Sequence, residues 1–108
     1  MFKEWKDIDG DRNIGLEIGQ YVVFAIDQGK NLWSINFALK SDILGNTGCW
    51  FETLTGLGAF RTIAVIKPAI IELISYLESN NLDWVCYCDK RRAKLYSRYL
   101  PSHKITNT

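Results

Sequence analysis

Over residues 32–39 a large apolar side chain occupies every second position, and polar or small side chains occupy most of the positions between, a pattern typical of a half-buried β-strand. Residues 14–26 are also rich in Val, Ile, Phe and Tyr, and the polar segment 27–31 separates the two runs. Strand-like runs joined by a short turn form hairpins. The pattern therefore predicts a β-hairpin over residues 14–39. The side of residues 32–39 that we expect to face a core carries Trp33, Ile35, Phe37 and Leu39.

The apolar residues of segment 58–79 recur three or four positions apart, as on one face of an α-helix. Pro68 interrupts the repeat, because proline lacks a backbone N–H and disfavours helical geometry at the residue before it. Two interpretations follow. We favour one helix over 58–79 that is kinked at the proline. The alternative is a strand over 61–66 followed by a helix that begins at Pro68.

The remaining segments predict shorter elements. Residues 82–88 are mostly apolar and indicate a buried strand, after which Asp89 can cap a second helix at about 90–99. The other expectations are an N-terminal arm at 1–13 with a turn at 7–11, a loop at 40–48, a strand at 49–54 and a polar tail at 101–108.

These elements predict one domain that spans residues 1–108. The chain is long enough for one hydrophobic core and too short for two. Aromatic residues make up 13% and charged residues 23%, which is an ordinary globular composition. We expect an α+β fold with a mixed, mostly antiparallel sheet of about four to five strands and two helices.

The net charge of +1 hides an uneven distribution along the chain. Residues 1–89 contain 7 Lys/Arg and all 12 Asp/Glu, whereas residues 90–108 contain 6 Lys/Arg and no acid. A helix with this charge can bind phosphates or the carboxylates of a protein partner, and a solvated charged face is the alternative. The candidate partner-binding residues are Lys90, Arg91, Arg92, Lys94 and Arg98.

The number of cysteines and the length of the apolar segments indicate the cellular compartment of the protein. The three cysteines, at 49, 86 and 88, would leave one unpaired in a disulfide framework and fit a reducing compartment. The C-x-C pair and His103 lack the paired spacing of zinc sites, so no metal is expected. No apolar stretch approaches the ~20 residues that cross a bilayer, and the first residues lack the apolar middle of a signal peptide. We expect a cytoplasmic protein with no membrane partner.

Two short motifs resemble the acetyltransferases of the GNAT type. Gly56 and Gly58, followed by Ala59, match the family's Gln/Arg-x-x-Gly-x-Gly/Ala turn, with Thr53 at the Gln/Arg position. Tyr96 has the spacing of the family's catalytic tyrosine. The resemblance implies that the turn holds the pyrophosphate of acetyl-CoA at a helix start and that Tyr96 protonates the leaving thiolate. A purely structural glycine turn and a tyrosine packed inward are the alternatives.

The order of elements over residues 14–100 resembles the second half of the GNAT fold and the small bacteriophage proteins that keep this fold in truncated form. The phage resemblance includes the Gly-Ala-Phe-Arg-like helix entry at 58–61 and the Arg-x-x-Leu-Tyr-x-Arg-Leu-like ending at 92–100. Only 13 residues precede the hairpin, where a full acetyltransferase has a further strand and two helices.

The phage resemblance implies a non-catalytic accessory protein that binds a host protein or nucleoprotein complex in the host cytoplasm and blunts host defence. No cofactor is expected for that function. The alternatives are an N-acetyltransferase that uses acetyl-CoA and a nucleic-acid-binding module. A homodimer through an edge strand is also compatible with the sequence.

Overall fold

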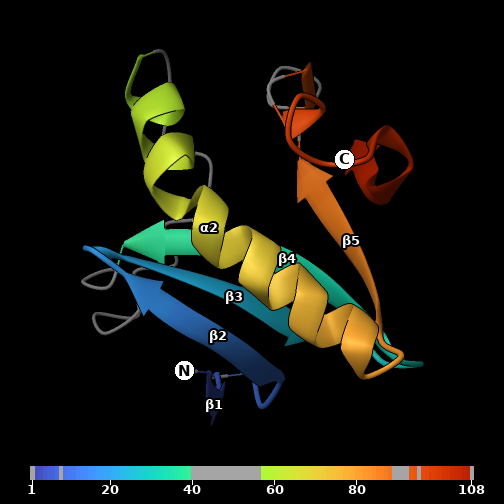
Figure 1. Ribbon diagram of the computed structural model, residues 1–108. Coiled ribbons are helices and arrows are strands. Elements are labelled where there is room, and N and C mark those ends of the chain that lie inside the picture. The colour runs from blue at the N-terminus through green and yellow to red at the C-terminus, as the bar shows by residue number, and fades with distance from the viewer. Residues whose placement is uncertain (1, 8, 40–56, 89–92, 95, 108) are drawn as a thin grey trace.

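The computed structural model describes residues 2–7, 9–39, 57–88, 93–94 and 96–107 (Figure 1). They form an α+β fold in which one long helix, α2 (Leu57–Ser79), crosses one face of a mixed six-stranded sheet of order β1-β2-β3-β4-β5-β6. The predicted α+β class is confirmed, although the sheet has six strands rather than four to five and the described residues contain one long helix. The strands are β1 (Lys3–Lys6), β2 (Arg12–Ile18), β3 (Tyr21–Asp27), β4 (Leu32–Leu39), β5 (Asp83–Cys88) and β6 (Ile105–Asn107).

The first four strands form an antiparallel meander. The turn predicted at 27–31 joins β3 to β4, as expected, and the strand predicted at 32–39 is β4. The run 14–26 is not one arm of a hairpin, because the chain reverses at Gly19, whose φ of 58° is accessible to glycine without steric cost. One glycine in an apolar run is a weak turn signal, which is why the pattern predicted a single strand.

The second half of the sheet is parallel. β5 pairs with β4 through Trp33 and Trp84 and through the residue on either side of each. Parallel neighbours need a long crossover connection, and α2 supplies it. The pairing of the two strands ends at Ser34 and Val85, although both strands continue, and Figure 1 shows β5 leading away from β4 beyond that point.

Helix α2 runs through Pro68 without a break in its assignment. The favoured interpretation of residues 58–79 is therefore confirmed, and the alternative strand at 61–66 is wrong. Figure 1 shows the helix axis changing direction between its first and second halves, which is the expected effect of an internal proline. The helix ends where Asn81 adopts a φ of 58° and the Leu82 N–H donates to the Leu77 carbonyl at 2.9 Å.

The main core lies between α2 and the sheet. Ile66, Leu73 and Leu77 on the helix are fully buried, and they pack with the side chains that β2, β3, β4 and β5 direct to that face. A second, smaller cluster lies on the opposite face of the sheet, where Trp5 and Phe24 place their ring centroids 5.8 Å apart. Burial on both faces explains why β3 is apolar at nearly every position.

The two ends of the chain supply the two edges of the sheet. The segment expected to be an N-terminal arm contains β1, and the segment expected to be a polar tail contains a 3-10 turn, η2 (Ser102–Lys104), and β6. Both strands are too short for a periodic pattern, so they depend on pairing with β2 and β5. The predicted loop at 40–48 and strand at 49–54 lie outside the described residues.

The second predicted helix, at about 90–99, is only partly within the described residues. Residues 93, 94 and 96 are helical, and the chain turns at 97–99 rather than continuing as a helix. Among the described residues, no helix combines the length and apolarity required to cross a bilayer.

Candidate functional site

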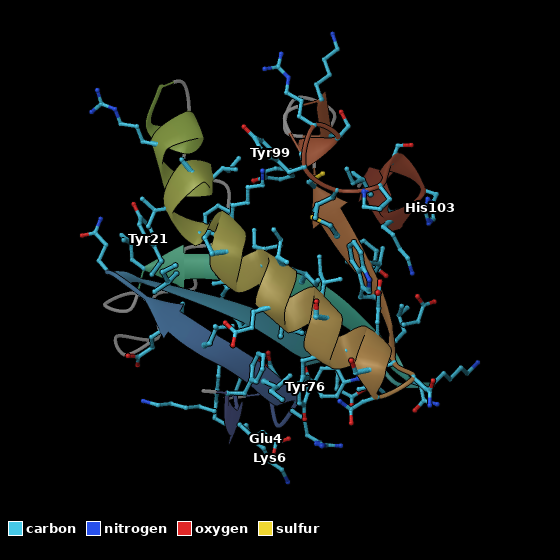
Figure 2. The ribbon with its side chains drawn as sticks, in the orientation of Figure 1. Glu4, Lys6, Tyr21, Tyr76, Tyr99 and His103 are labelled. Carbon is cyan, nitrogen blue, oxygen red and sulfur yellow. The ribbon has the colours of Figure 1, made fainter. Side chains whose placement is uncertain are left out.

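The candidate binding site lies where α2 meets the segment that follows β5. Lys67 of α2 places its Nζ atom 5.3 Å from the centroid of the Tyr99 ring, within the range of a cation–π interaction. Tyr99 is 40% exposed, and Figure 2 shows it pointing from the C-terminal segment toward α2. Lys94 and Arg98 on the same segment are exposed. We refer to Lys67, Lys94, Arg98 and Tyr99 as the basic end.

Local hydrogen bonds give this segment its shape. The Ser97 N–H donates to the Ala93 carbonyl at 3.0 Å, and the N–H groups of Tyr99 and Leu100 both donate to the Tyr96 carbonyl, at 2.9 and 2.8 Å. Two donors on one carbonyl close a tight turn at the end of the helical stretch. The turn directs Tyr96 into the core while Arg98 and Tyr99 remain on the surface.

Within the part of the chain that the structure describes, no carboxylate forms an ion pair with the basic end. Among the described residues, neither Lys94 nor Arg98 has a carboxylate within ion-pair distance. The sequence has no acid in 57–71 or in 90–108, so both elements that form the basic end carry only positive charge there. The predicted residues Lys90, Arg91 and Arg92 lie outside the described residues. Lys67 was not predicted, because it is distant in sequence and joins the site only through the fold.

An apolar hollow lies beneath the basic end, at the point where the β4–β5 pairing has ended. The hollow has room for about one water molecule. Tyr96 lines it and is only 7% exposed, and Ala93 and Leu100 pack against the same core. The lining residues from the sheet and helix are Ile35, Asn36, Phe37, Ile63, Ile70 and Cys86.

The residues that resemble an acetyl-CoA turn are placed only in part. Gly58 and Ala59 lie in the first turn of α2, and Gly56 lies outside the described residues. The helix start and the hollow containing Tyr96 belong to the same half of the molecule, because Ile63 of α2 lines the hollow. A pantetheine arm does not fit a space of this size unless the hollow widens.

Cys86 and Cys88 point into the core from the same face of β5. Burial, reinforced by the neighbouring Cys88, raises the pKa of Cys86 to about 12. A thiol with this pKa is protonated at neutral pH and is a poor nucleophile or metal ligand. His103 lies in the exposed turn η2, and Figure 2 shows it away from the basic end.

We expect Cys86 and Cys88 to resist alkylation in the folded protein. Their burial blocks access, and the raised pKa of Cys86 removes the reactive thiolate. Iodoacetamide treatment at pH 8 followed by peptide mass spectrometry should leave both unmodified, and the same treatment in guanidinium chloride should modify both. Rapid alkylation of either residue in the native protein would contradict this burial.

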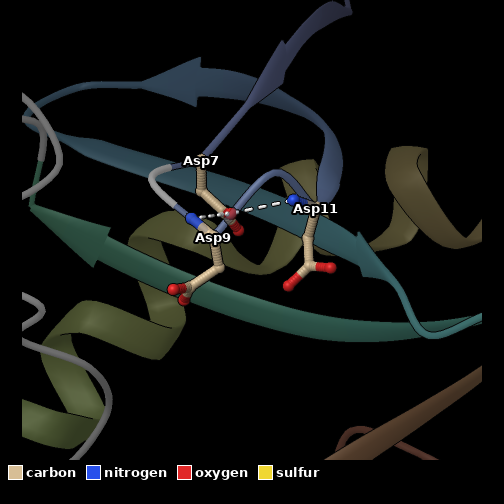
Figure 3. Close-up of side chains that lie close together, drawn as sticks. All are labelled: Asp7, Asp9 and Asp11. Atoms are coloured by element: carbon tan, nitrogen blue, oxygen red, sulfur yellow. Dashed lines mark hydrogen bonds between the residues drawn. The ribbon is translucent and has the colours of Figure 1, made fainter.

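Three carboxylates gather in the turn between β1 and β2 (Figure 3). The ligand atoms of Asp7, Asp9 and Asp11 lie within 4.8 Å of one another. Asp7 accepts hydrogen bonds from the N–H groups of Asp9 and Asp11 and from the Asn13 amide. Slight burial tends to raise the pKa of Asp7, but these hydrogen bonds outweigh it and lower the pKa below its usual value. The turn predicted at 7–11 is confirmed, and the hydrogen bonds that Asp7 accepts stabilise it.

Comparison of this chain with protein families, with curated proteins and with solved structures gives no match.

Proposed function

We propose that this chain is a non-catalytic binding protein whose basic end contacts an acidic surface of a host protein or nucleoprotein complex. The observation that carries the proposal is that Lys67 of α2 lies over the exposed ring of Tyr99, on the segment that also carries the exposed Lys94 and Arg98. Arginine beside an exposed tyrosine is the composition enriched where protein interfaces gain most of their affinity. The phage resemblance supports a host target whose inhibition blunts host defence.

The charge distribution favours a protein partner over nucleic acid. The net charge is only +1, and residues 1–89 carry an excess of acid that would repel a polyanion outside the basic end. Proteins that bind nucleic acid usually present an extended basic face. A compact basic end with an aromatic residue is better matched to a local cluster of carboxylates.

Charge reversal at the basic end tests the proposal. The double variant Lys94→Glu/Arg98→Glu should reduce capture of the partner from host lysate by about tenfold or more, because attraction to carboxylates becomes repulsion. The matched control is Lys6→Glu/Lys30→Glu, which makes the same charge change at exposed positions on β1 and on the β3–β4 turn. Capture should be quantified by mass spectrometry with the wild-type chain as reference.

Two results would count against the proposal. Equal loss of capture in both double variants would indicate a general charge effect rather than a specific surface. Binding of a random DNA duplex with an affinity that falls steeply as salt rises would favour the nucleic-acid alternative.

An N-acetyltransferase is the second candidate. The observation that favours it is the separation of β4 from β5 beyond Ser34 and Val85, with Tyr96 lining the hollow that results. The hollow as it stands does not admit a pantetheine arm, so the binding proposal takes precedence. Isothermal titration calorimetry with acetyl-CoA should show no binding. Micromolar binding that Gly58→Asp abolishes would instead establish the enzyme.

A further inference from the structure

The outward face of α2 carries an apolar strip with opposite charges at its two ends. The strip consists of Arg61, Ala64, Val65, Pro68, Ile71 and Glu72, and every one of these residues is exposed. We refer to these six residues as the outer strip. Figure 1 shows no described element over this side of the helix.

The apolar centre of the outer strip is unusual for a solvent-facing surface. Val65 is 45% exposed and Ile71 is 55% exposed, and they are two of the four large hydrophobic side chains exposed among the described residues. Together with Ala64 and Pro68 they occupy neighbouring turns of the same helix face. An amphipathic helix normally places polar residues at such positions, so this face is suited to contact with another apolar surface.

The outer strip carries a positive charge at one end, on Arg61, and a negative charge at the other, on Glu72. Arg61 and Glu72 are eleven positions apart, which is about 16 Å along a helix. Among the described residues, neither has an ion-pair partner. A second copy of the strip laid antiparallel brings each Arg61 level with the other copy's Glu72. A parallel copy would instead set like charge against like charge.

We propose that two copies of this chain associate through the outer strip, with the two α2 helices antiparallel about a twofold axis. The axis passes midway between Arg61 and Glu72, so Pro68 of each copy lies against the Val65 turn of the other. The contact is isologous, as in most homodimers, and Ala64 permits close approach of the helices. One helix face buries a small area, so the dimer dissociates in the micromolar range.

Sedimentation velocity over a concentration series tests this dimer in the full chain. The wild-type protein should shift from monomer to dimer in the micromolar range. Arg61→Glu and Glu72→Arg should each weaken association by about tenfold or more, because each places two like-charged pairs across the interface. The double variant Arg61→Glu/Glu72→Arg restores opposite charges at both ends and should recover the wild-type dissociation constant to within about threefold.

The recovery in the double variant separates a direct contact from damage to the helix, since two harmful substitutions would otherwise add. Lys6→Glu, an exposed reversal on β1, is the control and should leave association unchanged. Ile71→Asp should also abolish the dimer without unfolding the exposed helix face, as circular dichroism would show. A wild-type chain that stays monomeric at every concentration overturns the proposal, and so does a double variant no stronger than the single ones.

Discussion

Replacement of Trp84 by alanine is expected to lower the free energy of unfolding by about 4 kcal/mol, the middle of the range for buried aromatic side chains replaced by alanine. Trp84 lies on β5, where it is 2% exposed and directly opposite Trp33 in the parallel register. β5 and β4 are paired over only three residues on each strand. The loss of this ring therefore leaves a cavity at the place where the two halves of the sheet join.

The ring of Trp84 also organises the last segment of the chain. Its Nε1 donates to the Glu78 carboxylate at 3.2 Å, and the Nζ of Lys104 lies 5.2 Å from the ring centroid. Lys104 in addition forms a hydrogen-bonded ion pair with Asp83, which is the main cause of the lowered pKa of that carboxyl. These contacts connect β5 with α2 and with the chain just before β6.

Guanidinium chloride unfolding followed by circular dichroism measures the effect. Trp84→Phe is the control, because it keeps an aromatic ring and most of the packing and loses the hydrogen bond to Glu78, at a cost of about 1 kcal/mol. A similar small cost for both variants would mean that the Trp84 ring is not buried at the junction of β4 and β5.

Local patterns predicted the elements whose residues repeat over many positions. Residues 32–39, with a large apolar side chain at every second position, form β4, and residues 58–79, with apolar residues at helical spacing, lie in α2. Both signals come from residues close in sequence, since each element must direct its apolar side chains to one core. Pro68 did not break the helix, because burial of Ile66, Ala69 and Leu73 on both sides of it outweighs the loss of one hydrogen bond.

Features that depend on distant parts of the chain were not predictable in this way. β1 and β6 become strands through pairing with β2 and β5, which no pattern within three or four residues reveals. The basic end shows the same limit. Lys94 and Arg98 were predicted from local charge, whereas Lys67 reaches Tyr99 only because α2 folds over the sheet. The outer strip requires knowledge of which helix face is covered, and this follows from the tertiary structure.

Gly15 is under a severe steric constraint that cannot be predicted from the sequence. It lies on β2 opposite Phe24, on the sheet face away from α2. A Cβ atom at Gly15 would lie 2.5 Å from the Val23 carbonyl oxygen and 2.7 Å from the Phe24 Cβ. Both distances are far below van der Waals contact. The Val23 carbonyl oxygen belongs to the backbone, so it cannot rotate away as a side chain could.

We therefore expect Gly15→Ala to lower the free energy of unfolding by about 3 kcal/mol, the cost of forcing a side chain into fully packed space. To admit the methyl group, β2 must move away from β3, which disturbs the pairing and the packing of Phe24 against Trp5. This origin is steric and not conformational, since the φ of Gly15 is not among the positive values.

Gly10→Ala provides the matched comparison, because its φ of 84° is positive while no atom lies within 4 Å of the added carbon. That variant should lose about 1 kcal/mol from backbone strain alone. Denaturant unfolding of the two variants separates steric overlap from backbone strain. Gly15→Ala should lower the free energy of unfolding more than Gly10→Ala only if β2 and β3 approach each other closely. Equal losses of unfolding free energy would show that β2 and β3 lie farther apart at Gly15 than the structure places them. A larger loss of unfolding free energy at Gly15 would show that the missing side chain of this residue allows β2 and β3 to pack closely.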